Sequence, residues 1–382
     1  MNLDQRLEQL KREIPRVSPA EARQRCLDDA VLIAVREADE IAQGTPEGAR
    51  ALGRGYLEMR IGDVVPDRAR PVLLLCEATT RSMLAADDLR RMGYANVAAV
   101  DGGFQRWKQA GLPYVLPEIG DEDARQRYAR QIILPELGSA GQARLADARV
   151  VLVGAGGLGS PAALYLAAAG VGTLGLIDHD RVERSNLHRQ VLHRDDRLGM
   201  AKTESARLTL EALNPTIEVC CHPLRLEAAN VESVFSGYDI VVDGSDNFAT
   251  RYLVNDACLK LGLPTVYGAV QGLEGQVSVF PAGGRPCYRC LFAEPPPPGH
   301  APSCNEAGVL GVVPGIIGLL QALEVIKLIT GIGEPLIGRL ALFDGHRSRL
   351  REVALAADPG CAYCAPGRVF PGYTDNLEVC QP

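Results

Sequence analysis

The sequence predicts an α/β protein of two domains, and three observations lead to that prediction. The chain has 382 residues, more than one hydrophobic core usually supports. Short apolar runs of strand character alternate with segments of helical apolar spacing, as in parallel sheets covered by helices. Two cysteine pairs of identical spacing lie downstream of a glycine-rich turn, which indicates a nucleotide-binding core clamped by a structural metal.

A small parallel α/β domain is predicted over residues 16–116. Ser18 and Pro19 begin its first helix, as the N-cap and the first helical residue. The other elements expected are strands at 30–35, 71–76 and 96–100 and a helix at 83–92. Prolines and acidic residues that follow Val115 mark the end of the domain.

A larger α/β domain with a mostly parallel sheet is predicted over residues 121–367, followed by a tail at 368–382. It begins with a charged helix and a βαβ unit, which brings a strand directly into the glycine-rich turn. An antiparallel section begins near residue 276. The elements expected are strands at 149–153, 173–178, 217–222, 239–243, 259–270, 276–280 and around Leu340 and Leu350, and helices at 160–169, 202–213, 228–235 and 315–330.

Composition narrows the class of protein. Apolar residues make up 47% and charged residues 23% of the chain, as in folded globular proteins. A net charge of -7 argues against a protein that tracks nucleic-acid phosphates. The N-terminus lacks an apolar signal segment, and the longest apolar run, residues 312–320, is too short to span a bilayer. We therefore expect a cytoplasmic protein that uses neither a membrane nor nucleic acid as a partner.

The two CxxC pairs, Cys287 with Cys290 and Cys361 with Cys364, predict a metal site. Each pair brings two thiolates onto one tight turn, and two such turns complete a tetrahedral Cys₄ zinc site with no position left open for catalysis. Two unrelated buried pairs, or two redox dithiols, are the alternatives.

The glycine-rich turn at 154–159 (GAGGLG) follows a strand and opens a helix, so its amides can approach phosphates. Asp178 ends the next strand, where a carboxylate can accept hydrogen bonds from ribose. Asp246 follows another strand end and could hold Mg²⁺ or cap the next helix. The cations after Asp178 favour a triphosphate over NAD, unless they form a solvated surface. They are Arg181, Arg184, Arg189, Arg194, Arg197 and Lys202.

The chain resembles the ThiF/MoeB family, adenylyltransferases of ubiquitin-like sulfur carriers that are related to ubiquitin-activating enzymes. The resemblance implies a Rossmann-like domain that uses ATP and Mg²⁺ to adenylate the C-terminal glycine of a carrier ending in Gly-Gly. It also implies a homodimer with one structural Zn²⁺ per subunit. The motifs that carry it are the two CxxC pairs and residues 127–134, 154–160, 178–180, 185–190, 199–202, 243–247 and 304–309.

The resemblance assigns roles residue by residue. Gly157 lies against the ATP phosphates, Asp178 binds ribose, Lys202 contacts the phosphates, and Arg130 reaches into the partner subunit's site. Asp246 and Asn247 lie on the magnesium side, and the segment beside the nucleotide consists of Ser185, Asn186, Leu187, His188 and Arg189. The carrier's carboxylate is ionised at pH 7, so cations that remove the repulsion between anions matter more than a general base.

The smaller domain resembles the C-terminal half of a rhodanese domain, through residues 76–82 (CEATTRS), 93–97 and 101–113. The resemblance implies that Cys76 carries sulfur as a persulfide in a loop closed by Arg81, with a persulfide or thiosulfate as the sulfur donor. The loop lacks the usual glycine, and residues 34–36 read AVR where the family has DVR. A docking domain without sulfur transfer is the alternative.

Cys304 lies in a long Pro- and Gly-rich segment, residues 291–311, where several relatives place a reactive cysteine. A loop thiol there could form a thioester or an acyl persulfide with the activated glycine, or could be an ordinary loop cysteine. We expect acyl-AMP formation followed by sulfur transfer to a C-terminal thiocarboxylate. The alternatives are adenylation of a carboxylate on tRNA, an NAD-dependent oxidoreductase and a non-catalytic carrier-binding scaffold.

Overall fold

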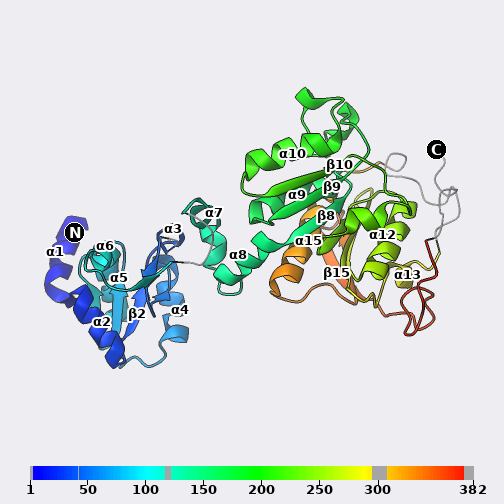
Figure 1. The fold of residues 1–382 in the computed structure, drawn as a ribbon. Coiled ribbons are helices and arrows are strands. Elements are labelled where there is room, and N and C mark those ends of the chain that lie inside the picture. The colour runs from blue at the N-terminus through cyan, green and yellow to red at the C-terminus, as the bar shows by residue number, and fades with distance from the viewer. Residues whose placement is uncertain (1–2, 42, 117–121, 295–307, 374–382) are drawn as a thin grey trace. The chain divides into compact units, whose positions relative to one another are not determined.

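The computed structural model describes residues 3–41, 43–116, 122–294 and 308–373. The chain divides into two compact units between Gln142 and Ala143 (Figure 1). The sequence had placed the start of the larger domain earlier, at residue 121. The first unit extends further because helix α7 (Glu122–Ile132) packs against helix α3 (Ala38–Ile41).

The first unit contains a parallel five-stranded sheet with strand order β1-β6-β5-β2-β4. Its strands are β1 (Arg16–Val17), β2 (Val31–Ala34), β4 (Arg50–Ala51), β5 (Val72–Leu75) and β6 (Val97–Val100). All four residues of β2, β5 and β6 are buried, as expected for strands covered on both faces. A separate two-stranded sheet pairs β3 (Thr45–Pro46) with β7 (Tyr114–Val115).

Helices cover both faces of this sheet, because alternate side chains of each strand point to opposite faces. One core joins Ile33 and Leu74 to α1 (Leu3–Glu13), α4 (Leu57–Val64) and α5 (Thr80–Arg91). The other core joins Leu32 and Leu73 to α2 (Pro19–Asp28) and α6 (Gly103–Gln109). A short 3₁₀ turn, η1 (Arg54–Tyr56), precedes α4. The predicted helix start is confirmed: Ser18 Oγ accepts from Glu21 N, with Pro19 as the first helical residue.

The second unit is built on an eight-stranded sheet with order β10-β9-β8-β11-β12-β13-β14-β15. Its first five strands run parallel and its last three pair antiparallel. The strands are β8 (Arg149–Val153), β9 (Thr173–Ile177), β10 (Glu218–His222), β11 (Ile240–Asp243), β12 (Thr265–Gln271), β13 (Glu274–Phe280), β14 (Arg339–Asp344) and β15 (Arg349–Ala354). The predicted Rossmann-like α/β fold and its antiparallel section are thereby confirmed.

Helices cover the parallel part of this sheet as well (Figure 1). The helix α9 (Gly159–Ala169) packs against α10 (Lys202–Leu213) and α15 (Val312–Thr330). The helices α11 (Val231–Phe235) and α12 (Phe248–Leu261) share a separate core with Val151 and Val241. The remaining helical segments within the described ranges are α8 (Gly138–Asp147), η2 (Arg184–Asn186), η3 (Asp195–Arg197) and α13 (Tyr288–Leu291).

At α12 the structure corrects one prediction and excludes one alternative. The strand expected from residue 259 begins only at Thr265, because residues up to Leu261 belong to α12. Asp246 does not cap this helix: the N-cap is its neighbour Asn247, whose side chain accepts from Thr250 N at 2.9 Å. Asp246 is therefore not needed for the helix terminus.

The apolar helix α15 is longer than the run considered in the sequence. Among the described residues, it is the one helix long and apolar enough to cross a bilayer by length and composition. It packs against α9, β12 and β13, and 44% of its most apolar window is buried. These contacts account for the buried part of its apolar surface.

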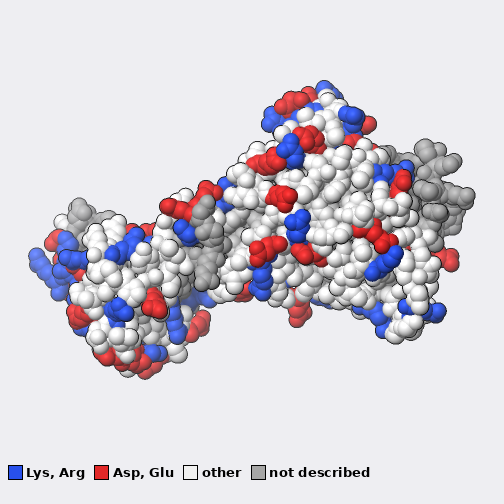
Figure 2. Space-filling view, in the orientation of Figure 1, with Lys and Arg blue, Asp and Glu red and all other residues white. Residues whose placement is uncertain are grey.

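Acidic and basic side chains are intermingled on the face of the molecule drawn in Figure 2. On that face the described residues form no continuous basic stripe, which agrees with the net charge of -7.

Candidate nucleotide site, cysteine cluster and thiol loop

One pocket of the second unit lies at the carboxyl ends of its parallel strands. The chain proceeds outward from β8 to β9 and β10 on one side and from β11 to β12 on the other. Ligands of open α/β sheets bind at such a switch point. The pocket is lined by the glycine-rich turn, by the segments that follow β9 and β11, and by the start of α12.

The glycine-rich turn requires glycine at two positions. Gly154 has a φ of +92°, and a Cβ on Gly159 would lie 1.9 Å from the carbonyl oxygen of Gly154. Asp178 holds this turn in place, because its Oδ2 accepts from Ala155 N and its Oδ1 from Asp180 N, both at 2.9 Å. The carboxylate keeps further lone pairs for a ligand.

Four cationic side chains line the pocket: Arg189, Lys202, Arg225 and Arg251. Lys202 has a side chain only 7% exposed, and its Nζ donates to Asp180 Oδ2 at 2.7 Å. Burial raises the pKa of Asp180, but the hydrogen bond and charge of Lys202 hold it below its usual value overall. Arg189 donates from Nη1 to Ser185 O at 3.1 Å and to His188 Nε2 at 2.8 Å. These contacts of Arg189 leave its charge uncompensated by a carboxylate within the part of the chain that the structure describes.

The other clustered arginines do not line the pocket, so the sequence argument from their density was wrong. Arg181 donates to Gly199 O, and Arg197 to Ser205 O and Thr209 Oγ1. The remaining two form ion pairs, Arg184 with Asp195 and Arg194 with Asp196. Each of these four arginines therefore bonds to groups within residues 195–209.

The acidic side of the pocket follows β11. Asp246 and Asn247 line it, as does Arg251, which is 8% exposed and donates to Ser245 O at 3.1 Å. Asp243, 2% exposed, accepts from the amide and the hydroxyl of Ser245. Burial raises the pKa of Asp243, although the charge of Arg251 opposes this.

The structure thus brings together six of the predicted nucleotide-site residues: Gly157, Asp178, Arg189, Lys202, Asp246 and Asn247. Four others, Ser185, Asn186, Leu187 and His188, form or follow the turn η2 and are not among the lining residues. Cys304 lies outside the described residues. Arg130 lies on α7, in the first unit.

Sequence reasoning gave no role to Asp180, Gln190 or Arg251, although all three line the pocket. Asp180 stands close to the end of β9, and that position was the available signal, whereas Arg251 lies within α12, which the sequence did not predict. Their pairing with Lys202 and with the loop after β11 required the structure.

A second groove continues from this pocket. It runs over β12, β13 and β14 and shares Asp246, Val270 and Arg251 with the first pocket. Its far end carries three arginines, Arg347, Arg349 and Arg351. The two cavities therefore meet at the residues that follow β11.

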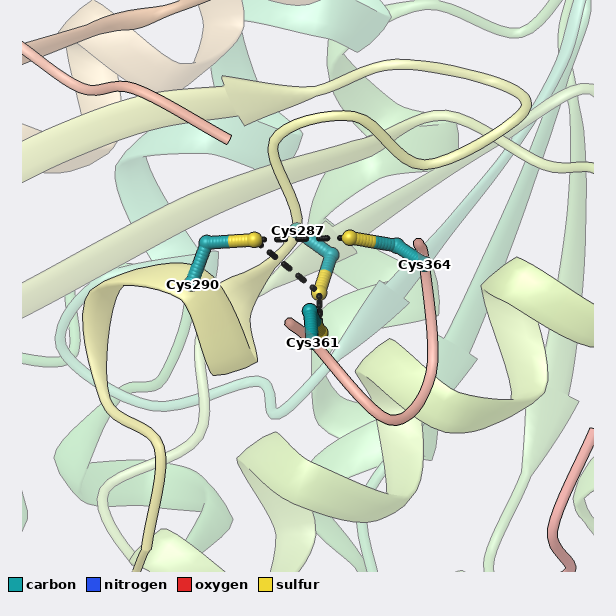
Figure 3. Close-up of side chains that lie close together, drawn as sticks. All are labelled: Cys287, Cys290, Cys361 and Cys364. Atoms are coloured by element: carbon teal, nitrogen blue, oxygen red, sulfur yellow. Dashed lines mark hydrogen bonds between the residues drawn. The ribbon is translucent and has the colours of Figure 1, made fainter. Parts of the chain in front are cut away.

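The four predicted cysteine ligands converge (Figure 3). Their Sγ atoms lie within 4.8 Å of one another, with separations of 3.9 Å for Cys287 to Cys290, 3.7 Å for Cys287 to Cys361 and 3.4 Å for Cys290 to Cys364. A disulfide would need about 2 Å. Tetrahedral Zn–S bonds of about 2.3 Å place sulfur atoms roughly 3.8 Å apart. The donor set and its spacing fit zinc.

The surroundings of the cluster also favour a cation. Burial raises the pKa of the Cys287 thiol, and the neighbouring thiols raise it further. A bound dication reverses this effect and keeps the thiols deprotonated. The backbone amide of Asp358 donates to Cys290 Sγ at 3.4 Å. Arg289, inside the first CxxC turn, pairs with Asp256 of α12 at 2.7 Å, and Tyr288 N donates to Asn255 Oδ1 at 2.9 Å.

The predicted thiol loop of the first unit follows β5 and leads into α5. Cys76 is 1% exposed, and its Sγ lies 3.6 Å from Ser82 Oγ. The start of α6 presses against the loop: Phe104 N donates to Cys76 O at 2.9 Å, and a Cβ on Gly103 would lie 2.4 Å from that same oxygen. Arg81 is paired with Glu40 of α3.

Together, the glycine-rich turn, the cationic side chains and Asp246 at a sheet switch point define a Rossmann-like protein built to hold a phosphorylated ligand. The four-cysteine cluster, and a second α/β unit that carries Cys76 in a loop, distinguish it from Rossmann-like proteins that have the nucleotide pocket alone.

The chain belongs to the ThiF family, whose model matches residues 128–363. The rhodanese-like domain model matches residues 18–110. Both resemblances stated from the sequence are therefore confirmed.

Curated relatives are named adenylyltransferase and sulfurtransferase MOCS3. That of Drosophila sechellia is 51% identical over 240 residues, covering 63% of this chain and 53% of the relative. MOCS3-2 of Zea mays is 49% identical over 249 residues, covering 65% and 52%. The chain thus spans about half the length of the curated relatives it matches.

Similar solved structures support the fold. Crystal structures of E. coli MccB with AMPCPP and selenomethionine MccA and of PaaA have TM-scores of 0.55. The first is 26% identical and matches 63% of this chain and 74% of its own. The second is 25% identical and matches 64% and 77%.

Proposed function

We propose that the larger unit adenylates the C-terminal glycine of a ubiquitin-like sulfur carrier and that the smaller unit supplies sulfur for a C-terminal thiocarboxylate. The observation that carries the first half is the convergence of Arg189, Lys202 and Asp246 on the glycine-rich turn. The names of the MOCS3 relatives support both halves.

The proposed reaction joins two anions. A carboxylate oxygen of the carrier attacks the α-phosphorus of ATP, a new P–O bond forms, the bond to the β-phosphate breaks, and pyrophosphate leaves. Arg189 and Lys202 lower the repulsion between the reactants and stabilise the departing pyrophosphate. Asp246, placed beside them, would hold Mg²⁺, which neutralises phosphate charge when bound.

The second groove suits the carrier's tail. It opens into the nucleotide pocket at Asp246 and Arg251, so an extended chain end lying along it would bring its carboxylate beside the phosphates. The buried guanidinium of Arg251 would then lie where the two reactants meet.

For the sulfur step we propose a persulfide on Cys76, whose outer sulfur attacks the acyl-adenylate and displaces AMP. This leaves an acyl disulfide on Cys76. We propose that the Cys304 thiol attacks Cys76 Sγ, so that the S–S bond breaks, the thiocarboxylate leaves and a Cys76–Cys304 disulfide forms, which an external thiol then reduces. We further propose that the Cys₄ cluster holds one structural Zn²⁺ and that the active form is a homodimer in which Arg130 reaches the partner subunit's site.

The decisive experiment is carrier-dependent ATP–pyrophosphate exchange with a panel of proteins ending in Gly-Gly. We expect one of them to stimulate exchange, and Asp246→Ala to reduce it about 100-fold or more, as the loss of a group that stabilises transition-state charge does. Arg194→Ala is the matched surface control, because Arg194 pairs with Asp196 outside the pocket.

Stimulation by tRNA or by a small carboxylic acid, with none by any carrier, would show that the substrate is wrong. Binding of NAD without exchange would contradict adenylation altogether. Carrier binding without exchange would identify a scaffold.

A further inference from the structure

Two arginine–glutamate pairs enclose the Cys76 loop. Arg81 donates to both carboxylate oxygens of Glu40, with Nη1 to Oε2 at 2.7 Å. Arg36, 2% exposed, donates from Nε to Glu77 Oε2 at 2.8 Å. Arg36 also donates to the carbonyls of Glu40 and Gly44, so it ties the loop to the segment around α3.

The backbone of the loop can still stabilise an anion. The N–H groups of Glu77, Ala78 and Thr79 donate to no group in the described part of the chain. The first amides of α5 follow them directly and, like those of any helix start, have no intrahelical acceptor. A single thiolate or persulfide charge on Cys76 can therefore be held by amides alone.

The positive side chain that could attract an anionic sulfur donor to Cys76 is already paired with a carboxylate. Arg81 is the loop's own cation, and Glu40 accepts both of its hydrogen bonds from another element. Glu77, inside the loop, adds a further carboxylate whose partner Arg36 is buried. An anionic donor that approaches Cys76 thus meets paired arginines and two carboxylates.

We propose that Glu40 determines which sulfur donors Cys76 accepts, by withholding Arg81 from anionic donors. The favoured class is a cysteine-type persulfide, and the disfavoured class is an inorganic dianion such as thiosulfate. This inference rests on the proposed role of Cys76 as the sulfur carrier, and it adds a specificity-determining residue that is not part of the thiol loop.

Both donors react with the same balance of atoms. The Cys76 thiolate attacks the outer sulfur of R–S–SH, an S–S bond forms, and the thiolate R–S⁻ leaves. With thiosulfate the thiolate attacks the outer sulfur and sulfite leaves. Only the second reaction brings a dianion to the loop and releases another, so only it needs a free cation beside Cys76.

The test measures sulfur loading of Cys76 in the full-length chain, by the mass of the peptide that carries it, with cysteine persulfide or thiosulfate as donor. We expect Glu40→Gln to raise the rate with thiosulfate about tenfold, because removal of one like charge is worth at least this much near an anion. The rate with cysteine persulfide should change less than about twofold on the same grounds.

Asp29→Asn is the matched control. Asp29 pairs at 2.6 Å with Arg70, which lies just before the start of β5. Cys76 follows the opposite end of that strand. This substitution removes the same charge from the same unit and should leave both rates unchanged. A thiosulfate rate raised equally by Asp29→Asn would overturn the role of Glu40.

Loosening of the loop is separated from the charge effect by alkylation of Cys76. In Glu40→Gln, negatively charged iodoacetate should gain over neutral iodoacetamide, whereas a loosened loop would speed both equally and refute the proposal. Unchanged thiosulfate kinetics, with Cys76 loaded by both donors, would also refute it while leaving the proposed function intact. Loading by neither donor, with carrier-dependent exchange preserved, would remove this inference together with the sulfur-transfer half of the proposed function.

Discussion

The two units place their candidate sites at the same point of a similar scaffold but give the arginine of each site a different kind of partner. Each site follows the carboxyl end of a buried parallel strand, β5 in one and β8 in the other, and leads into a helix. In the first unit, Arg81 is taken up by Glu40. In the second, Arg189 contacts a carbonyl and an imidazole. The carboxylates brought in from elsewhere in the fold, rather than the arginines themselves, decide how much positive charge a ligand meets.

The largest effect is expected from Cys76→Ala, which tests whether the site of the first unit carries the sulfur. We expect loss of all sulfur loading and thiocarboxylate, because no other thiol stands in the loop, while carrier-dependent ATP–pyrophosphate exchange stays unchanged. Both activities are measured on the full-length chain. Cys26→Ala, a half-buried cysteine of the same unit, is the control. Persistence of the thiocarboxylate in Cys76→Ala would show that the first unit does not carry the sulfur.

Next in size is Lys202→Ala. It should lower kcat/KM for exchange about 100-fold, because a buried cation that faces developing phosphate charge is lost. It should leave persulfide loading of Cys76 as it is. Arg197→Ala provides a comparison, since Arg197 lies in the same segment but contacts Ser205 and Thr209. Equal losses for both variants would mean that local folding, rather than charge, explains the defect.

The metal cluster should affect only the second unit. Cys361→Ser, or chelation, removes one ligand or the metal and should cost about 3 kcal/mol or more, because metal binding contributes directly to folding. For a unit of this size that is a fall in Tm of about 6–12 °C. Calorimetry with metal analysis checks both the transition and the stoichiometry, and Cys220→Ser is the control. A metal-free preparation of unchanged Tm would contradict the assignment.

The smallest expected effect is a pH dependence confined to the second unit. Burial lowers the pKa of His193, which lies 3.0 Å from Ala155 O and 3.1 Å from Ser205 Oγ. Just below the ordinary histidine pKa of 6.5, the His193 imidazole is therefore protonated in the unfolded chain but not in the folded unit. The unit should lose up to about 1.4 kcal/mol of stability per pH unit as pH falls below 6.5.

Urea titrations between pH 7.5 and 5.5 measure this slope, and His193→Gln should flatten it. The exposed His346 offers the control His346→Gln, which should keep the slope. A slope that His193→Gln leaves unaltered would assign it to other groups, such as the partly buried His222, whose pKa is also lowered by burial.

Much of the fold could be predicted from the sequence, because buried parallel strands are short apolar runs and glycine turns are specific in sequence. The strand before the turn and α10 were predicted with their observed bounds. The helix α12 was not predicted, since its buried Arg251, Asn255 and Asp256 disguise the apolar spacing that reveals other helices. Their partners come from distant segments, which a linear pattern does not show.

The site was predictable to the same extent and for the same reason. Asp246 was found because it follows a strand end, whereas Lys202 was found among the clustered cations and through the family resemblance. A count of arginines, however, cannot say which side chain turns inward, so Arg189 was distinguished from Arg194 by the family resemblance and not by charge density. Glu40 was missed because it lies far from Cys76 in the sequence and meets Arg81 only in the folded unit.

Helix α12 connects the cysteine cluster to the nucleotide pocket. Asn255 and Asp256 anchor the helix to the first cysteine turn, and Asn247 caps its start next to Asp246. Asn255 lies eight residues after Asn247, a separation of roughly 12 Å along the helix axis. A metal bound by the cysteines would then stabilise the position of α12 without contacting the substrate. Loss of that metal would displace the Asp246 carboxylate relative to the phosphates.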